Sequence, residues 1–356
     1  MLRKTLLIAT MACAGAAAHG QTEPLYLIPD SENDRVWAFS AVDGSLVDDA
    51  FITDPGVVDG VDVFNRPIEA MMTPLGTILV TDQFADVVSH FGFDSSFIEV
   101  FSLGGVRDND IMDNIRGGHV LTQGPFAGDV LVTNNGRLND LVVSQRNVKR
   151  LDGDDGAELE DFAFNRYGGI RGPFDAIEYN GEVLVADEGQ DKIVRYTLDG
   201  KFNERFTSSF EVPQLDFPQQ MAVASSGNLL VCAFSSGFIL EFDPDGDLVG
   251  QYSPGTLELF RGVAELDNGN LLVTTTTGVF EVTRTGLVVD VEATDGDFRY
   301  ITRFIPPTDG LGTGTETPPR DVPREPLAMP DPDPRDREEI MADERGLTYS
   351  TKGAGS

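Results

Sequence analysis

Three polar residues have spacings in the sequence that could support chemistry. Glu69, Asp175 and Gln220 each precede, by 10 or 11 residues, the central valine of a short apolar run. Two carboxyl groups held together can act as general acid and base, or as oxygen ligands for calcium. Other charged residues lie in the matching stretches of further segments: Arg116, His119, Arg261 and Arg299. These seven residues are the predicted ligand-binding positions, provided that the fold brings them together.

The apolar runs behind these positions form a repeat with six copies. Their central residues recur at intervals of 42 to 53 residues, at Ile28, Val80, Val132, Val185, Val231 and Val273. A period in this range is typical of propellers and other repeat arrays. In most copies a second β-branched and aromatic run follows, and then an Asp-Gly turn such as Asp199-Gly200. Asp-Gly between apolar runs favours a tight hairpin.

Two further runs complete each unit, one before the apolar marker, as in Pro173 to Ile177, and one after the turn. Four antiparallel strands make one propeller blade. The sequence therefore predicts an all-β, six-bladed propeller. The first copy lacks its innermost strand, whereas a spare strand, Phe298 to Phe304, follows the last copy. We expect these two ends to pair and close the ring, which leaves no open sheet edge.

The repeat resembles the NHL-type propellers and their streptogramin-lyase-like and gluconolactonase-like relatives. The resemblance rests on Pro-x-x-Ala-(Ile/Met), Val-x-Asp and the Asp-Gly turn, most clearly from Pro173 to Gly200. It implies that the inner-strand position of Gly262 is typically glycine, so the polar residues at Glu69, Asp175 and Gln220 depart from the pattern. A polar binding surface in the central channel is one explanation, and a merely solvated channel is the other.

The resemblance also implies two kinds of enzyme site. A streptogramin-lyase-like mechanism uses histidine and acid groups in the channel, and here it would depend on His119 alone. A gluconolactonase-like calcium site draws on Glu, Asn and Asp, for which Glu69, Asn134 and Asp187 are the nearest substitutes. The Glu-Gly-Pro motif of that family is missing.

Other clusters of polar residues have structural explanations. The acid or amide that ends an apolar run, as at Asp82, can hold a turn by binding backbone amides. The run Asp152 to Gly156 is one residue short of a calcium loop and falls at a hairpin position, so we expect a turn. With three histidines and two cysteines in the chain, we predict no zinc site. No metal or cofactor is predicted, with calcium as the alternative.

The ends of the chain differ from the repeats. Residues 1–20 have a basic start and a short Ala-rich apolar run, which is typical of a signal peptide. Residues 21–305 hold the propeller. Residues 306–356 are rich in proline and charge, a composition that favours disorder. We therefore expect a secreted or periplasmic protein with a disordered tail.

The charge of the chain restricts its partners. With 59 acidic and 26 basic residues the formal net charge is −33, which disfavours nucleic acid and anionic membranes. We expect no membrane insertion and a monomer. The leading functional hypothesis is an exported binding module for a protein, glycan or small ligand. The alternative is a calcium-dependent hydrolase or lyase with Glu69 and Asp175 in the channel. The sequence leaves enzyme activity open and assigns no catalytic residue.

Overall fold

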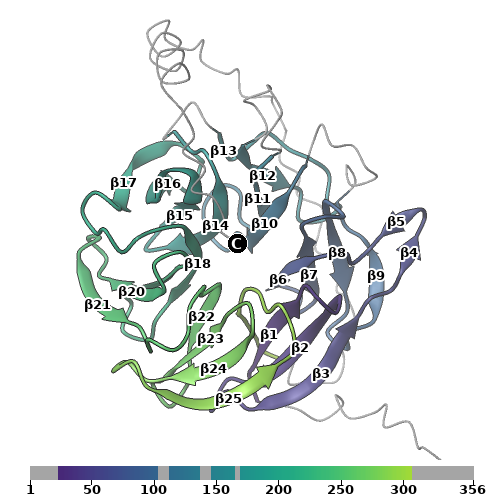
Figure 1. Cartoon of the computed structure of the whole chain (residues 1–356). Helices are drawn as coiled ribbons and strands as arrows, with labels where there is room; N and C mark the ends of the chain where they lie inside the picture. Colours follow the sequence, from purple (N-terminus) through teal and green to yellow (C-terminus); the bar gives the residue numbers. More distant parts are fainter. Residues whose placement is uncertain (1–22, 103–111, 137–145, 165–168, 307–356) are drawn as a thin grey trace, which may run out of the picture. The chain divides into compact units, whose positions relative to one another are not determined.

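The computed structural model describes residues 23–102, 112–136, 146–164 and 169–306. These residues belong to one compact unit and form six antiparallel four-stranded sheets arranged as blades around a common centre (Figure 1). The predicted six-bladed β-propeller is therefore confirmed. The predicted signal peptide, and the predicted tail beyond Pro306, lie outside the described residues.

Each blade runs from an innermost strand at the centre of the ring to an outermost strand at its rim. Blade 1 contains β26 (Thr302–Phe304), β1 (Leu25–Asp30), β2 (Arg35–Ser40) and β3 (Leu46–Thr53), and blade 2 contains β6 (Pro67–Met72), β7 (Ile78–Asp82), β8 (Val87–Phe91) and β9 (Phe97–Val100). Blade 3 contains β10 (Ile115–Val120), β11 (Val130–Asn134), β12 (Asn147–Leu151) and β13 (Ala163–Phe164), and blade 4 contains β14 (Pro173–Tyr179), β15 (Glu182–Asp187), β16 (Lys192–Thr197) and β17 (Phe202–Ser208). Blade 5 contains β18 (Pro218–Val223), β19 (Leu229–Ala233), β20 (Phe238–Phe242) and β21 (Leu248–Tyr252), and blade 6 contains β22 (Gly262–Glu265), β23 (Leu271–Thr274), β24 (Gly278–Val282) and β25 (Val288–Thr294).

The second strand of each blade is the one that the apolar markers identify. Every residue of β1, β7, β11, β19 and β23 is buried, because each blade is covered by a neighbour on both sides. Runs of valine, leucine and isoleucine suit a strand whose two faces are both covered. The outermost strands, such as β21, are largely exposed. The hydrophobic core therefore lies between the blades, as where Trp37 and Phe298 of blade 1 share a cluster with Leu272 of blade 6.

The two ends of the propeller close the ring as expected. Leu25 pairs with Phe304 and Leu27 with Thr302 in antiparallel register. The contact continues outside the regular strand, where the Arg299 amide donates to the Pro29 carbonyl at 2.9 Å. In Figure 1 the purple strands of blade 1 accordingly lie beside the green and yellow strands of blade 6.

Turns between the strands confirm the structural role predicted for the recurring acids. Asp82 accepts hydrogen bonds from the backbone amides of Phe84 and Ala85 and, through its other oxygen, from those of Asn65 and Arg66. The Asp152 to Gly156 run is a turn, closed by the Gly156 amide on the Asp152 carbonyl at 2.8 Å.

Two features of the described residues were not expected. One is a short hairpin of β4 (Val57–Val58) and β5 (Val61–Asp62) between blades 1 and 2, and the other is a 3-10 helix, η2 (Glu188–Gln190), after β15. Within the part of the chain that the structure describes, no helix is both long and apolar enough to cross a membrane.

Candidate functional site

The inner strands of four blades contain bulges near the centre of the ring. In β6, for example, the pairing register shifts by one residue between Pro67 and Glu69, and in β14 it shifts between Pro173 and Asp175. The same irregularity occurs in β10 and β18. A bulge sets two residues against one and redirects side chains. Bulges thus help to aim inner-strand side chains toward the centre.

The strand register defines two layers of equivalent residues at the centre. The first, which we call the central layer, consists of Glu69, Gly117, Asp175, Gln220, Gly262 and Tyr300. The residues one position earlier form the second, which we call the arginine layer: Ile68, Arg116, Phe174, Gln219, Arg261 and Arg299. Of the predicted site residues, six belong to these two layers.

Three side chains of the central layer converge at Gly117. A Cβ atom on this glycine would lie 2.9 Å from both Glu69 Oε2 and Asp175 Oδ1, and 2.8 Å from Tyr300 Cε2. A larger residue at Gly117 would therefore collide with all three side chains. The predicted convergence of Glu69 and Asp175 is present, and glycine at position 117 permits it.

The polar side chains of the central layer bind the backbone of neighbouring blades. The Gly118 amide donates to Glu69 Oε2 at 2.7 Å, and the Met221 amide donates to Asp175 Oδ2 at 2.7 Å. Gln220 Oε1 accepts from the Val263 amide at 3.1 Å and from the Ile301 amide at 2.9 Å. All three side chains are buried. They fasten inner strands to one another, and their role in ligand binding stays a prediction.

Tyr300 occupies the centre of the ring and was missed by the sequence analysis. Its hydroxyl donates to the Phe174 carbonyl at 3.1 Å, which joins blade 1 to blade 4. The side chain is fully buried. The signal that could have found it is its position directly after Arg299 in the spare strand, in register with Glu69 and Asp175.

Burial dominates the electrostatics of this layer. It raises the pKa of Asp175 to about 7. Burial, followed by the charge of Asp175, raises the pKa of Glu69 well above its usual range. Two neighbouring carboxyl groups that are shielded from water disfavour double ionisation, so the pair holds a proton more readily than free carboxyl groups do.

The arginine layer gathers cations around a single carboxylate. Arg261 lies 3.1 Å and Arg66, which precedes β6, lies 3.3 Å from the carboxylate oxygens of Asp297. Arg299 also pairs with Asp297, and its Nε donates to Ser31 Oγ at 2.6 Å. These three arginines and Asp297 thus link blades 1, 2 and 6 at the ends where the inner strands begin.

Arg116 differs from Arg66, Arg261 and Arg299 in that it has no ion pair with a carboxylate among the described residues. Its Nε and Nη1 are buried without a hydrogen-bond partner, as are the same two atoms of Arg261. Its guanidinium lies over the Phe174 ring at 4.8 Å. Burial is the main cause that lowers the pKa of Arg116 to about 10; Tyr300 and Glu188 act to raise this pKa, and the charges of Arg66 and Arg261 act to lower it.

An aromatic row continues from Phe174 along the same end of the ring. Phe174 and Phe217 meet edge to face at 5.0 Å, and Phe217 and Phe234 meet at 5.2 Å. Phe217 has a φ of 58°, although it is bulky and precedes a proline. Both properties disfavour this backbone conformation, and such outliers cluster at ligand sites. The sequence analysis did not identify Phe217.

His119 lies apart from this group. Its Nε2 is 3.4 Å from Glu178 Oε2, near the turn that follows β10. Burial acts to raise the pKa of Glu178, but hydrogen bonds from His119 and Thr122 outweigh it and lower that pKa to about 2. The structure therefore does not bring His119 together with Arg116, Arg261 and Arg299.

The residues closest to a gluconolactonase-like calcium set do not fit a cation. Glu69 Oε2 accepts the Gly118 amide, Asn134 Oδ1 the amide of Asp113, and Asp187 Oδ1 the amides of Arg171 and Gly172. Oxygens that already accept amide hydrogens are poorly placed to ligate calcium. Across the described ranges, no cluster of three or more His, Cys, Asp or Glu side chains could hold a metal ion.

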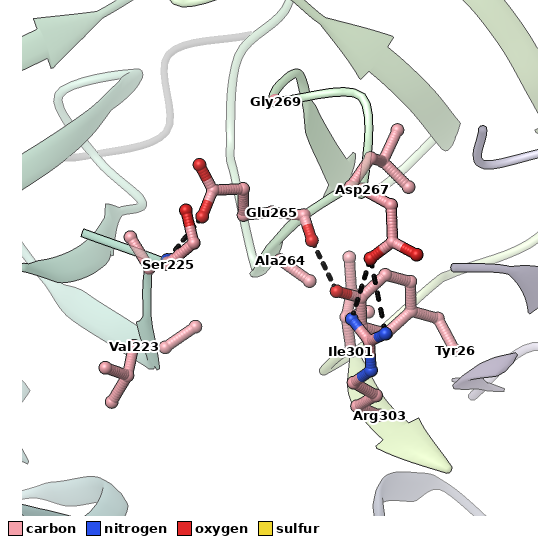
Figure 2. A pocket seen from close by; sticks show the side chains of 12 residues that line it. Tyr26, Val223, Ser225, Ala264, Glu265, Asp267, Gly269, Ile301 and Arg303 are labelled. Carbon is pink, nitrogen blue, oxygen red and sulfur yellow. Dashed lines mark hydrogen bonds and ion pairs between the residues drawn. The ribbon is translucent and has the colours of Figure 1, made fainter. Parts of the chain in front are cut away.

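A pocket of about 530 Å³ lies at the other end of the inner strands, between blades 5, 6 and 1. Figure 2 shows Ser225 beside Glu265, and Arg303 joined to Asp267 next to the Tyr26 ring. The Tyr26 hydroxyl donates to the Glu265 carbonyl at 2.5 Å, and both Nη atoms of Arg303 donate to Asp267 at 3.2 Å. The polar groups of this pocket are thus bonded to one another over an apolar wall that includes Val223, Ala264 and Ile301.

Comparisons with known proteins identify the fold. No family model and no curated protein matches the sequence. Among solved structures, a nidogen/laminin complex matches with a TM-score of 0.60 at 13% identity, covering 79% of this chain and 98% of that one. A Bacteroides caccae protein of unknown function matches with a TM-score of 0.54 at 14% identity, and the match covers 79% of this chain and 99% of that one.

A gluconolactonase from Xanthomonas campestris matches with a TM-score of 0.50 at 18% identity, and the match covers 66% of this chain and 78% of that one. At these identities the likeness concerns the fold alone, and it agrees with the strand order and ring closure described above. The chain has a six-bladed β-propeller fold, as its NHL-like sequence pattern predicted.

Proposed function

We propose that this chain is an exported binding propeller that takes a small molecule or the end of a glycan at its arginine layer. The observation that carries the proposal is the unpartnered Arg116 guanidinium beside the Phe174 ring. Ligand sites are mostly apolar and aromatic with a few polar groups that orient the ligand, and buried donors without a partner beside an aromatic ring fit that description. The polar groups of the central layer, in contrast, already have backbone partners.

Charge and architecture support a soluble ligand over a polymeric anion. The formal net charge of −33 repels nucleic acid at long range, whereas a small ligand can respond to the local field of the arginines. Tyr300 closes the centre beneath Phe174, so a ligand would contact the arginine layer from the ends where the inner strands begin. Export depends on the predicted signal peptide.

An enzymatic role is the second candidate. It is favoured by the buried pair of Glu69 and Asp175, whose raised pKa values suit proton transfer near neutral pH. Both side chains are buried, and an oxygen of each accepts a backbone amide, so a substrate would need to displace Tyr300. An assay against a panel of lactones, with and without calcium, tests this role. Turnover that Glu69→Gln abolishes would establish it.

A ligand screen tests the binding proposal directly. Saturation-transfer NMR would be run with neutral sugars, amino acids and organic acids on the full chain. Phe217→Ala should weaken the binding of the ligands found. Val223→Ala, in the pocket at the other end, should leave their binding unchanged. Ligands weakened only by Val223→Ala would move the site to that pocket, and the absence of any ligand would contradict the proposal.

A further inference from the structure

We infer that the arginine layer recognises an anionic group, a carboxylate or phosphate carried on a planar or apolar body, and that Arg116 binds it. This inference rests on the binding function proposed above and specifies the chemistry of the ligand.

The first argument is the distribution of acceptors. Arg66, Arg261 and Arg299 share the carboxylate of Asp297. Arg116 has no such partner within the described ranges, although its Nε and Nη1 are buried. A guanidinium is always charged and presents five N–H donors, and leaving buried donors unpaired has a cost in free energy. A ligand that supplies oxygen acceptors would remove this cost.

The second argument is the local charge. Four arginines meet at this end of the ring, where the nearest carboxylates are Asp297, with Asp30 beside it, and Glu188, with Asp187 beside it. Arg66 and Arg261 both disfavour the charged form of Arg116. A bound anion would offset this mutual repulsion, since it attracts each cation that now repels the others.

The third argument is the aromatic row beside Arg116. Phe174 lies under the guanidinium, and Phe217 extends the surface at 5.0 Å from Phe174. Phe217 keeps a φ of 58° next to Pro218, a conformation that packing must hold against its own strain. A planar body attached to the anionic group could stack on this row while its oxygens reach Arg116.

The geometry of arginine narrows the ligand class. Guanidinium groups bind carboxylate and phosphate oxygens in a bidentate manner, which a hydroxyl group cannot reproduce. Benzoate, inorganic phosphate and benzyl alcohol therefore serve as probes. Benzoate has both the anion and the ring, phosphate has the anion alone, and benzyl alcohol has the ring alone.

Isothermal titration calorimetry on the full chain tests the inference at low ionic strength. We expect benzoate or phosphate to bind at least tenfold more tightly than benzyl alcohol. Arg116→Ala should weaken that binding at least tenfold, and Arg116→Lys should restore part of it. The control Arg303→Ala, which removes an arginine that also faces an aromatic ring, should change it less than twofold.

The outcomes separate the inference from the binding function. If benzyl alcohol binds as well as benzoate, and Phe217→Ala weakens both, the site binds ligands without selecting anions and the inference is overturned alone. If neither anion binds at millimolar concentration, or if Arg116→Ala binds benzoate like the native protein, the inference also fails. If Arg116→Ala does not fold, the same titrations are made with Arg116→Gln, which keeps the length of the side chain more closely.

Discussion

The hydroxyl of Tyr300 donates a hydrogen bond to the carbonyl of Phe174 at 3.1 Å, so two blades on different sides of the ring are joined through its centre. Tyr300 lies two residues before β26, the last strand of the propeller, while Phe174 belongs to the arginine layer. The same bond that helps to close the ring therefore also fixes the aromatic surface beside Arg116.

Removing this bond should lower stability without changing the fold. In Tyr300→Phe the Phe174 carbonyl loses one of its two buried donors and keeps the Thr133 hydroxyl at 3.1 Å, so we expect a cost of about 0.5–1.5 kcal/mol. Urea denaturation measures the free energy of unfolding. Tyr179→Phe is the matched control, because its hydroxyl donates to the Gly227 carbonyl at 2.8 Å in a more exposed position. Equal losses in the free energy of unfolding for the two variants would show that the central hydrogen bond stabilises the protein no more than the peripheral one.

Ring closure makes a second prediction. A chain ending at Asp297 lacks Phe298, Tyr300 and β26, so blade 1 loses its inner strand and Trp37 loses its contact with the Phe298 ring. We expect this chain to lose cooperative thermal unfolding in circular dichroism. A chain ending at Pro307 keeps the pairing and should melt within a few degrees of the full chain. Similar behaviour of both truncations would show that β26 does not close the ring in solution.

The sequence predicted this closure but not the network at the centre. The repeat period and apolar markers are local properties of the chain, and they suffice to count blades and align Glu69, Asp175 and Gln220. The partners of these side chains are backbone amides of other blades, such as Met221, and depend on bulges and on how adjacent strands meet. Phe217 was missed for a related reason, since its positive φ is imposed by packing and opposed by its own sequence.

The buried carboxyl pair should make stability depend on pH. The folded-state pKa of Asp175 is about 7, above its ordinary value of 3.8. The folded protein therefore holds a proton that the unfolded chain releases. This contribution is fully present below about pH 4 and is lost as the pH rises toward 7.

Asp175→Asn mimics the protonated side chain and keeps an oxygen for the Met221 amide. Relative to the native protein, its free energy of unfolding should rise between pH 4 and 7, by on the order of 1 kcal/mol per pH unit. Other buried acids such as Asp82 titrate in the same direction, so the difference between the two proteins is the quantity to follow. A difference that stays constant with pH would mean that Asp175 is ionised in the folded state.

The strained aromatic residue should contribute more to binding than to stability. Phe217→Ala keeps the strain at φ 58°, because alanine retains the Cβ atom, but it removes the aromatic surface. We expect the dissociation constant of benzoate to rise about two- to tenfold, which corresponds to an aromatic contact of about 0.5–1.5 kcal/mol. Phe210→Ala is the control, because Phe210 is 90% exposed. A large drop in melting temperature with unchanged benzoate binding would assign Phe217 a purely structural role.

The acidic composition should make the propeller more stable in salt. With a formal net charge of −33, repulsion between carboxylates opposes the folded state more than the expanded one. Screening shortens the range of this repulsion from about 30 Å at 0.01 M salt to about 3 Å at 1 M. We therefore expect the melting temperature to rise between these concentrations of sodium chloride.

Chloride could also stabilise the protein by binding the arginine layer, and Arg116→Ala separates the two effects. General screening predicts the same increase in both proteins, whereas a chloride site predicts a smaller one in the variant. A melting temperature that is flat or falling in the native protein would show that pairs such as Arg150 with Asp129 offset the repulsion.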